Sequence, residues 1–244
     1  MNTNIIRLKE VDSTNDFLCH HSDCGDNDIV VVTAEYQTNG RGQGTNHWES
    51  EDGANLLFSI LVRPQGVDAS HQFVLSMAHA LALREALGGY VAGISLKWPN
   101  DVYWRDYKIS GTLIETALSG KSVRQCIFGT GINVNQETFL SSAPNPVSLR
   151  HILGREVPVD QLLDKVLEAF RRYYQLVLDG SYAAIRHSYM EALYRREGIH
   201  RYRDAQGLFE AEFADVTDEG CLVLRAVGGG LREYGFKEVA FVND

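Results

Sequence analysis

The sequence predicts an α/β domain followed by a small C-terminal β-barrel. Strand-like apolar segments alternate with amphipathic helical segments over residues 1–197, whereas only short strand-like segments with Gly and Asp turns follow Gly198. The composition, with 44% hydrophobic and 23% charged residues, is ordinary for a folded globular protein. We therefore predict two domains, 1–197 and 198–244, of which the second is small enough to depend on docking to the first.

Strands of the first domain are predicted where β-branched or apolar runs are bounded by Gly, Asp or Asn. These runs are Ile29–Glu35, Leu56–Val62, Asp101–Trp104, Lys108–Glu115 and Cys126–Phe128. Residues His71–Leu87 carry apolar side chains at helical spacing, and Gly88 would end that helix. A second helix is predicted from Asp160, as its N-cap, to a stop at Gly180, and a third over Ser181–Arg196.

The second domain is predicted from alternation and from short strands. Phe209, Ala211 and Phe213 alternate with polar residues, as in a half-buried strand. Further short strands are predicted at Cys221–Ala226, Leu231–Phe236 and Glu238–Val242. Such strands, separated by Gly and Asp turns, are typical of a small barrel.

Charge and composition exclude several classes of partner. The formal net charge is −9 and no run of Lys or Arg exceeds two residues, so we expect no DNA partner. No apolar run is long enough to span a bilayer and no secretory signal is visible, so we expect a cytoplasmic protein with no membrane partner. The cysteines Cys19, Cys24, Cys126 and Cys221 show no C-x-x-C spacing, which indicates reduced thiols and no zinc site.

A glycine-rich loop over Gln37–Trp48 is the first candidate for chemistry. Alternating glycines let backbone N–H groups approach an anion, and Arg41 adds an always-charged fork suited to phosphate or carboxylate. Trp48 could offer a flat face to an adenine ring. Taken alone, the pattern is equally compatible with a flexible polar surface loop.

The remaining candidate segments are each ambiguous in isolation. Lys97–Asp101 reads Lys-Trp-Pro-Asn-Asp, which fits either a rigid binding corner or a simple turn with a buried Trp. Lys108 could be an ordinary exposed lysine at a strand end. Gly129–Asn133 could be a strand-end turn, and Asp12–Asp16 first of all resembles a helix N-cap with capping-box spacing.

The order of these segments is more informative than any one of them. The series reads Asp12-Ser13-Thr14-Asn15, Ala34-Glu35-Tyr36-Gln37, Gly40-Arg41-Gly42, Trp48, Gly53-Ala54-Asn55-Leu56, Lys97-Trp98-Pro99-Asn100-Asp101, Lys108-x-x-Gly111 and Gly129-x-Gly131-Ile132-Asn133. It resembles the biotin–protein ligases over nearly the whole chain. The resemblance implies a mixed-sheet, class II synthetase-like catalytic domain with a C-terminal SH3-like barrel.

The resemblance also implies a two-step reaction with ATP and biotin as substrates and Mg²⁺ as cofactor. The biotin carboxylate attacks the α-phosphate of ATP, giving biotinyl-AMP and pyrophosphate. A lysine of a biotin carboxyl carrier domain, from a biotin-dependent carboxylase, then attacks the acyl carbon.

Site residues follow from the resemblance, position by position. Biotin is expected against Ser13, Thr14, Asn15, Gln37, Gly40, Arg41, Lys108 and Gly111. ATP or the adenylate is expected against Gly42, Gln43, Trp48, Lys97, Asn100 and Asn133. Lys108 and Arg41 are the residues expected to act in catalysis.

The residue types suit that task. Two unit negative charges ~4 Å apart repel by about 4 kcal/mol at an effective dielectric of 20, so a carboxylate meets a phosphate only with cations nearby. Arg41, Lys97 and Lys108 are the candidates for this screening. One position departs from the family: Gln43 stands where these ligases commonly have a second loop arginine. A Gln can only hydrogen-bond the adenylate phosphate, so we expect a more leaky intermediate.

Two other functions remain open at this point. The first is a lipoate or octanoate ligase or transferase of the same fold, although the Gly40–Gly42 and Lys97–Asp101 motifs favour biotin. The second is a biotin sensor without turnover, which the joint presence of the three cations disfavours. Some relatives carry an N-terminal DNA-binding domain, and we expect the form without it because Ile5 lies only a few residues before Asp12. Relatives can form homodimers through sheet edges.

Overall fold

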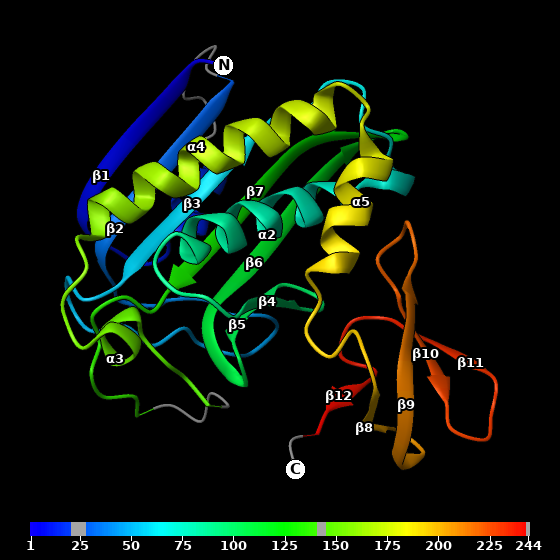
Figure 1. Ribbon diagram of the computed structural model, residues 1–244. Helices are drawn as coiled ribbons and strands as arrows, with labels where there is room; N and C mark the ends of the chain where they lie inside the picture. Colours follow the sequence, from blue (N-terminus) through cyan, green and yellow to red (C-terminus); the bar gives the residue numbers. More distant parts are fainter. Residues whose placement is uncertain (21–27, 141–144, 243–244) are drawn as a thin grey trace.

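The computed structural model describes residues 1–20, 28–140 and 145–242, and it has a seven-stranded mixed sheet at its centre (Figure 1). The strands lie in the order β1-β2-β3-β7-β6-β5-β4. Only β1 and β2 run parallel, and every other neighbouring pair is antiparallel. The strands are β1 (Thr3–Val11), β2 (Ile29–Gln37), β3 (Leu56–Val62), β4 (Ile94–Lys97), β5 (Asp101–Trp104), β6 (Tyr107–Ser119) and β7 (Ser122–Ile132). The prediction of a mixed α/β fold is confirmed.

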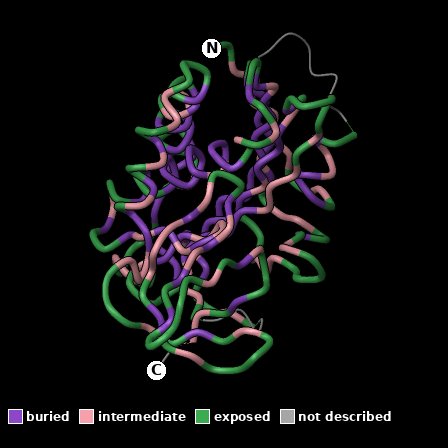
Figure 2. The backbone as a smooth tube through the Cα atoms, turned by 90° about the vertical axis from the view of Figure 1, so that its right-hand side faces the viewer, coloured by how far each residue is buried: buried purple, intermediate pink, exposed green. Residues whose placement is uncertain are grey.

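Both faces of this sheet are buried, and successive side chains along a strand point to opposite faces. In β2, Val31 belongs to the large core beneath the helices, whereas Val30 and Val32 pack with Leu18 on the other face. The helices are α1 (Thr14–His20), α2 (Phe73–Gly88), α3 (Leu149–Leu153), α4 (Val159–Leu178) and α5 (Tyr182–Glu191), and a 3₁₀ turn spans Ala69–His71. Helices α2 and α4 lie together across one face (Figure 1), and the buried segments run through the interior (Figure 2). No helix in the described part of the chain is long and apolar enough to cross a membrane.

Two helix boundaries differ from the prediction. Asp160 is not the N-cap of α4: Pro158 holds that position with an extended backbone, and Asp160 lies in the first turn, where an acid suits the helix dipole. Gly180 follows α4 with a φ of +72°, as a helix stop should. Helix α5 ends five residues before Arg196, at Glu191, because the Ala192 carbonyl and the Tyr194 N–H bond to Leu96 in the edge strand β4.

The β6–β7 hairpin is longer than predicted. Strand β6 continues to Ser119, Gly120 turns with a φ of +59°, and β7 begins at Ser122. Residues Gly129–Gly131 therefore lie within β7 and not in a strand-end turn. Their pairing with β3 and β6 on both sides explains the difference, since strands flanked on both sides have every backbone group bonded.

A second, antiparallel sheet follows α5. It comprises β8 (Ile199–Asp204), β9 (Gly207–Val216), β10 (Leu222–Ala226), β11 (Leu231–Tyr234) and β12 (Ala240–Phe241). The order is β11-β10-β9-β8-β12, and among the described residues β11 and β12 do not pair to close a barrel. An SH3-like barrel and a domain boundary at Gly198 therefore stay predictions. The described cysteines Cys19, Cys126 and Cys221 are free thiols, and Cys24 lies outside the described residues.

A small interface joins this second sheet to the first. The Trp98 indole N–H donates to the Gly220 carbonyl at 2.8 Å. The Phe236 ring lies edge-on to Trp98, with centroids 5.5 Å apart, and 6.2 Å from the Phe73 ring of α2. Trp98 is buried, as expected for the Lys97–Asp101 segment. Its two partners, Gly220 and Phe236, both come from the C-terminal part of the chain.

Gly220 tests this interface. Its φ is +96°, and a Cβ there would lie 2.6 Å from the Phe73 ring. Gly228 has a similar φ of +71°, but a Cβ added there would meet no atom within 4 Å. Gly228→Ala should therefore lower the free energy of unfolding by only about 1–2 kcal/mol, from the strain of a left-handed alanine. Gly220→Ala should lower the free energy of unfolding by about 1–3 kcal/mol more than Gly228→Ala does, because its Cβ also overpacks the interface. Urea denaturation of both variants checks the difference, and equal losses would contradict it.

Candidate functional site

One cavity of about 780 Å³ gathers nearly all of the predicted site residues. Every one of them except Gly40 lines it, although they come from opposite ends of the sequence. Gly40 is buried beside the cavity, and a Cβ there would press on the Trp48 carbonyl and on the Gln37 amide. A cavity of this size suits a drug-sized or nucleotide-sized ligand.

One end of the cavity carries a hydrogen-bonded network around α1. The Thr14 backbone N–H and hydroxyl both donate to Gln37 Oε1, at 2.8 and 3.0 Å. The Ser59 hydroxyl lies 2.7 Å from Thr14 Oγ1 and 2.6 Å from Asn15 Oδ1. The Asn15 amide donates to Glu115 Oε2 at 2.8 Å. These buried polar groups hold one another in a fixed arrangement, which a polar ligand group can meet without reorganisation.

Glycines in β6 and β7 form the floor of the cavity. Gly111 and Gly131 are direct cross-strand partners, so they face the same side of the sheet. The Trp48 ring lies against both of them, and a Cβ on Gly131 would overlap it. A Cβ on Gly129 would likewise overlap the Asn15 side chain. The glycine spacing of the sequence is therefore required by close approach of Asn15 and Trp48, and not by backbone conformation.

The Trp48 indole N–H is buried and has no hydrogen-bond partner among the described residues. Buried donors are nearly always satisfied, so an orphaned one beside a cavity indicates room for an acceptor from a ligand. The nearest cation on the ring face is Lys108, whose Nζ lies 5.9 Å from the ring centroid. Trp48 therefore lies in the cavity wall, and its packing near a bound adenylate stays a prediction.

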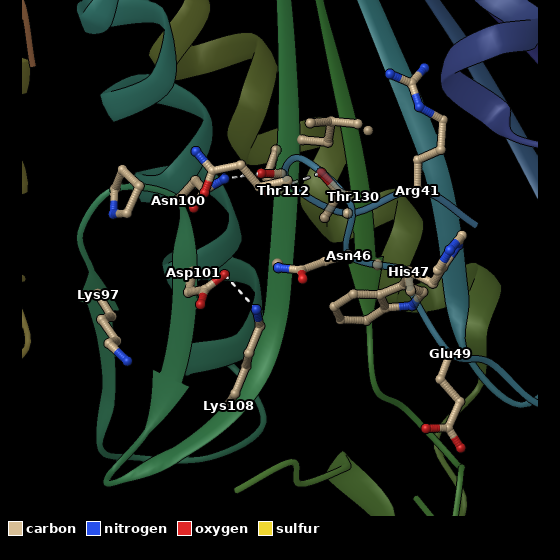
Figure 3. A pocket seen from close by; sticks show the side chains of 18 of the residues that line it. Arg41, Asn46, His47, Glu49, Lys97, Asn100, Asp101, Lys108, Thr112 and Thr130 are labelled. Atoms are coloured by element: carbon tan, nitrogen blue, oxygen red, sulfur yellow. Dashed lines mark hydrogen bonds and ion pairs between the residues drawn. The ribbon is translucent and has the colours of Figure 1, made fainter. Parts of the chain in front are cut away.

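Lys108 and Lys97 supply positive charge to the cavity in different ways. Lys108 pairs with Asp101 at 2.8 Å, and both side chains are mostly buried (Figure 3). Lys97 donates to the Tyr103 hydroxyl at 2.8 Å. Burial lowers the pKa of Lys97 to about 8, because the charged ammonium is poorly solvated there. Lys97 is therefore a cation whose charge is lost at mildly alkaline pH.

Arg41 does not point its charge at the Lys108–Asp101 pair. Its guanidinium bonds to the Asp16 and Glu115 carboxylates, the latter at 2.9 Å, and is directed away from Lys108 (Figure 3). The Asp16 backbone N–H does bond to the Ser13 hydroxyl, as the predicted N-cap requires. The Asp16 carboxylate, however, is taken by Arg41, so the expected capping box is only half formed.

The glycine-rich loop is a narrow hairpin in this structure. Arg41 and His47 form an isolated β-bridge, the Gly42 N–H donates to the Asn46 carbonyl at 2.7 Å, and the Trp48 N–H donates to Gly40. The Gly42 N–H is thus used within the loop in this conformation, and a role of the loop N–H groups in anion binding stays a prediction. The loop must change shape before that N–H can bind a phosphate.

The two asparagines lie on the central hairpins. The Asn100 amide donates to the Thr112 carbonyl, which fixes the turn between β4 and β5 against β6. Asn133 is buried just after β7, and its N–H donates to the Ile109 carbonyl at 2.9 Å. Beneath them, on the helix side, the buried His79 bonds to the Thr130 hydroxyl at 2.8 Å. Burial lowers the pKa of His79 to about 3, so this histidine is neutral.

Three charged residues near the cavity were missed by the sequence analysis: Asp16, Glu115 and Lys237. Glu115 could have been found, because it lies four residues after Gly111 on a predicted strand and so shares its face. Asp16 was considered only as a helix cap. Lys237 had no signal in the sequence, since its position depends on how the second sheet docks.

The donor set of the described residues does not form a metal cage. Within residues 1–20, 28–140 and 145–242, no three His, Cys, Asp or Glu side chains gather as ligands. Mg²⁺ usually binds through substrate phosphates, water and one or two carboxylates, and Glu49 and Asp101 are carboxylates that line the cavity. The residues therefore fit a magnesium ion that arrives with a nucleotide.

Comparisons with known proteins identify the family of this chain. The Biotin/lipoate A/B protein ligase family matches residues 8–133. The chain is similar to a biotin--[acetyl-CoA-carboxylase] ligase of Paracoccus denitrificans, with 32% identity over 81% of this chain and 85% of the relative. It is 28% identical to the bifunctional ligase/repressor BirA of Bacillus subtilis, over 82% of this chain but 62% of that protein.

Among solved structures, the fold is similar to the biotin protein ligase from Aquifex aeolicus in complex with biotin and ATP. The TM-score is 0.80, the identity is 27%, and 99% of each chain is covered. The resemblance to biotin–protein ligases found in the sequence is confirmed. The chain belongs to the Biotin/lipoate A/B protein ligase family.

Proposed function

We propose that the protein is a biotin–protein ligase that forms biotinyl-AMP from biotin and ATP and then transfers biotin to a lysine of a biotin carboxyl carrier domain. The observation that supports this proposal most is that the motif residues from Ser13 to Asn133 line one cavity. The Paracoccus denitrificans relative has this activity in its name, and the Aquifex aeolicus structure contains both substrates. Lipoate remains the second candidate, because the family includes lipoate ligases.

In this proposal the α1 end of the cavity receives the ring system of biotin. The ureido group of biotin offers one carbonyl acceptor and two N–H donors. Ser13, Thr14, Asn15 and Gln37 supply hydroxyl and amide groups that can match both kinds of partner. Gly111 has no side chain, which allows Trp48, Asp101 and Lys108 to approach the strand closely at the point where the valeryl carboxylate would meet Lys108.

The reacting groups meet at Lys108. A carboxylate and an α-phosphate repel, and the Lys108 ammonium has two N–H donors left after its bond to Asp101. The carboxylate oxygen attacks the α-phosphorus and the bond to pyrophosphate breaks. In the second step the carrier lysine amine attacks the acyl carbon, loses a proton, and AMP leaves. Mg²⁺, when bound with ATP, neutralises charge on the leaving pyrophosphate.

Arg41 contributes to this reaction only after its ion pairs open. Its partners Asp16 and Glu115 are partly exposed, and exposed ion pairs are worth about 0–1 kcal/mol. Binding of an anionic ligand can therefore outweigh them. Opening of the loop hairpin at the same time would free the Gly42 N–H and bring Gln43 toward the phosphate.

The finer structural expectations belong to the same proposal. A class II synthetase-like catalytic domain and an SH3-like C-terminal barrel are supported by the likeness to the Aquifex aeolicus ligase. The acceptor is a carrier domain of a biotin-dependent carboxylase, and no DNA partner is expected from a net charge of −9. We expect the protein to work in the cytoplasm.

Transfer of label to an apo-carrier domain tests the function. The protein, ATP, Mg²⁺, biotin and the apo-carrier are mixed and blotted with streptavidin, and a parallel mixture contains lipoate and is probed for lipoyl-lysine. We expect biotin transfer, and loss of about 10²-fold or more in Lys108→Gln because a charge at the reacting centre is removed. Lys9→Gln, on the exposed side of β1, is the control. Activity with lipoate alone would overturn the choice of biotin.

Lys97 predicts a pH dependence. Its pKa of about 8 means that the cation is present below pH 8 and is lost as the pH rises through that value. The kcat/KM for ATP reports the free enzyme, so it should fall above about pH 8 in pyrophosphate release assays. Lys97→Arg keeps its charge and should remove this alkaline limb. An unchanged profile in the variant would contradict the role of Lys97.

Gln43 predicts a leaky intermediate. The loop has Arg41 but no second arginine, and Gln43, which stands in that place, can only hydrogen-bond the adenylate phosphate. Chasing radiolabelled biotinyl-AMP from the wild type and from Gln43→Arg should give slower release from the variant, by about tenfold for a gain of 1.4 kcal/mol. Equal rates of biotinyl-AMP release from the two proteins would contradict this role of Gln43.

A further inference from the structure

The polar network at the α1 end of the cavity contains more oxygen contacts than hydroxyl hydrogens. Thr14 Oγ1 lies 3.0 Å from Gln37 Oε1 and 2.7 Å from Ser59 Oγ. Ser59 Oγ in turn lies 2.6 Å from Asn15 Oδ1. Each hydroxyl supplies one hydrogen and an amide oxygen supplies none, so within this group two hydrogens serve three contacts. One oxygen of the group is therefore left without a hydrogen from its neighbours.

This count depends on which way the two amides are turned, and the Gln37 amide is fixed by the backbone. The Thr14 backbone N–H lies 2.8 Å from the side-chain atom of Gln37 that also meets the Thr14 hydroxyl. A backbone N–H can only donate, so that atom is the amide oxygen. Gln37 therefore adds no hydrogen to the group.

The Asn15 amide is fixed by Glu115. A carboxylate can only accept hydrogen bonds, so the Asn15 atom that lies 2.8 Å from Glu115 Oε2 is the nitrogen. The Leu113 carbonyl, 3.4 Å from the same nitrogen, is a second acceptor on that side. Asn15 Oδ1 is thus turned toward Ser59, where it accepts and cannot donate.

The bond between Asn15 and Glu115 does not involve the glycine-rich loop. Asn15 belongs to α1, Ser59 to β3 and Glu115 to β6. Asn15 is 2% exposed and rests on Gly129, where a Cβ would overlap its amide. Only the bond from Glu115 to Arg41 would be lost when the loop opens. The orientation of the Asn15 amide is therefore set by the sheet and α1.

We propose that Glu115 is a positioning residue that makes the cavity specific for a ligand head with N–H donors, an inference that rests on the proposed function. Thr14 and Asn15 line the cavity, whereas Ser59 is fully buried, so a ligand can reach the network through the first two. The ureido ring of biotin has two N–H donors, and one of them satisfies the oxygen that lacks a hydrogen. The dithiolane ring of lipoate has none. A site built to bond an N–H group strongly rejects an analogue without it.

Glu115 acts in this proposal through Asn15. Without the carboxylate, the Asn15 amide can turn over and present its nitrogen to Ser59. That nitrogen would supply the missing hydrogen from within the protein. The network would then have no oxygen left for a ligand N–H, and the advantage of a ureido head would be reduced.

Binding of two matched ligands tests this role. The first is biotin, and the second is a biotin analogue methylated at both ureido nitrogens, which has no N–H donor. Dissociation constants of both are measured by competition for the wild type, Glu115→Leu, Glu115→Ala and Glu115→Gln. Asp16→Asn is the matched control, because it weakens the other ion pair of Arg41 and leaves the Asn15 amide bonded.

We expect Glu115→Leu and Glu115→Ala to weaken biotin about tenfold, which is about 1.4 kcal/mol, and the methylated analogue less than about twofold. Glu115→Gln keeps an oxygen for the Asn15 nitrogen and should bind biotin within about threefold of the wild type. Asp16→Asn should change both ligands alike. Equal weakening of the two ligands by Glu115→Leu, or unchanged biotin binding, would overturn the role. A selective loss in Asp16→Asn would instead assign the effect to Arg41 and would equally overturn it.

A second measurement asks whether Glu115 acts through Asn15. In the background of Asn15→Ala, adding Glu115→Leu should weaken biotin by no more than about twofold, because the amide that Glu115 orients is already absent. A further tenfold loss in this background would contradict the proposal. A wild type that binds lipoate but not biotin would overturn the proposed function itself, whatever the variants do.

Discussion

The site depends on close approach across the β6–β7 hairpin. Gly111, Gly129 and Gly131 present no side chains to the cavity, so the Trp48 ring and the Asn15 amide can rest on the sheet itself. Asn15 is also held by Ser59 and Glu115, and Trp48 by its backbone N–H bond to the Gly40 carbonyl. A methyl group at Gly131 would overlap the Trp48 indole, and one at Gly111 would press on Trp48, Asp101 and Lys108. The absence of side chains at these glycines is therefore what allows Trp48 and Asn15 to take their positions in the cavity wall.

Charge is organised around the same floor. The chain as a whole is strongly acidic, yet Arg41, Lys97, Lys108 and Lys237 all line the cavity. Three of them are held by protein groups, which keeps like charges apart while no ligand is present. In the proposed reaction, phosphate and carboxylate oxygens of the substrates replace these partners. Since exposed ion pairs are weak, the exchange costs little at Arg41 and more at the mostly buried Lys108.

The two sheets are joined through the same segment that contributes to the site. Trp98 bonds to the Gly220 carbonyl and packs on Phe236, while its neighbours Lys97 and Asn100 line the cavity. Docking of the second sheet and the shape of the cavity are therefore physically coupled. The coupling also explains why a Trp-Pro pair, which alone is compatible with a simple turn and a buried ring, occurs beside residues that line the cavity.

The sequence by itself determined five of the seven strands of the central sheet, the glycine-rich loop and the family, because β-branched runs, glycine spacing and motif order are local or ordered along the chain. Leu56–Val62 and Asp101–Trp104 were predicted with their observed bounds. Tertiary structure alone decided which partners each charge has. Arg41 bonds to Glu115, 74 positions away, and Lys237 reaches Gly44 from the other sheet. Such pairings depend on how distant segments pack, and local sequence patterns carry no record of them.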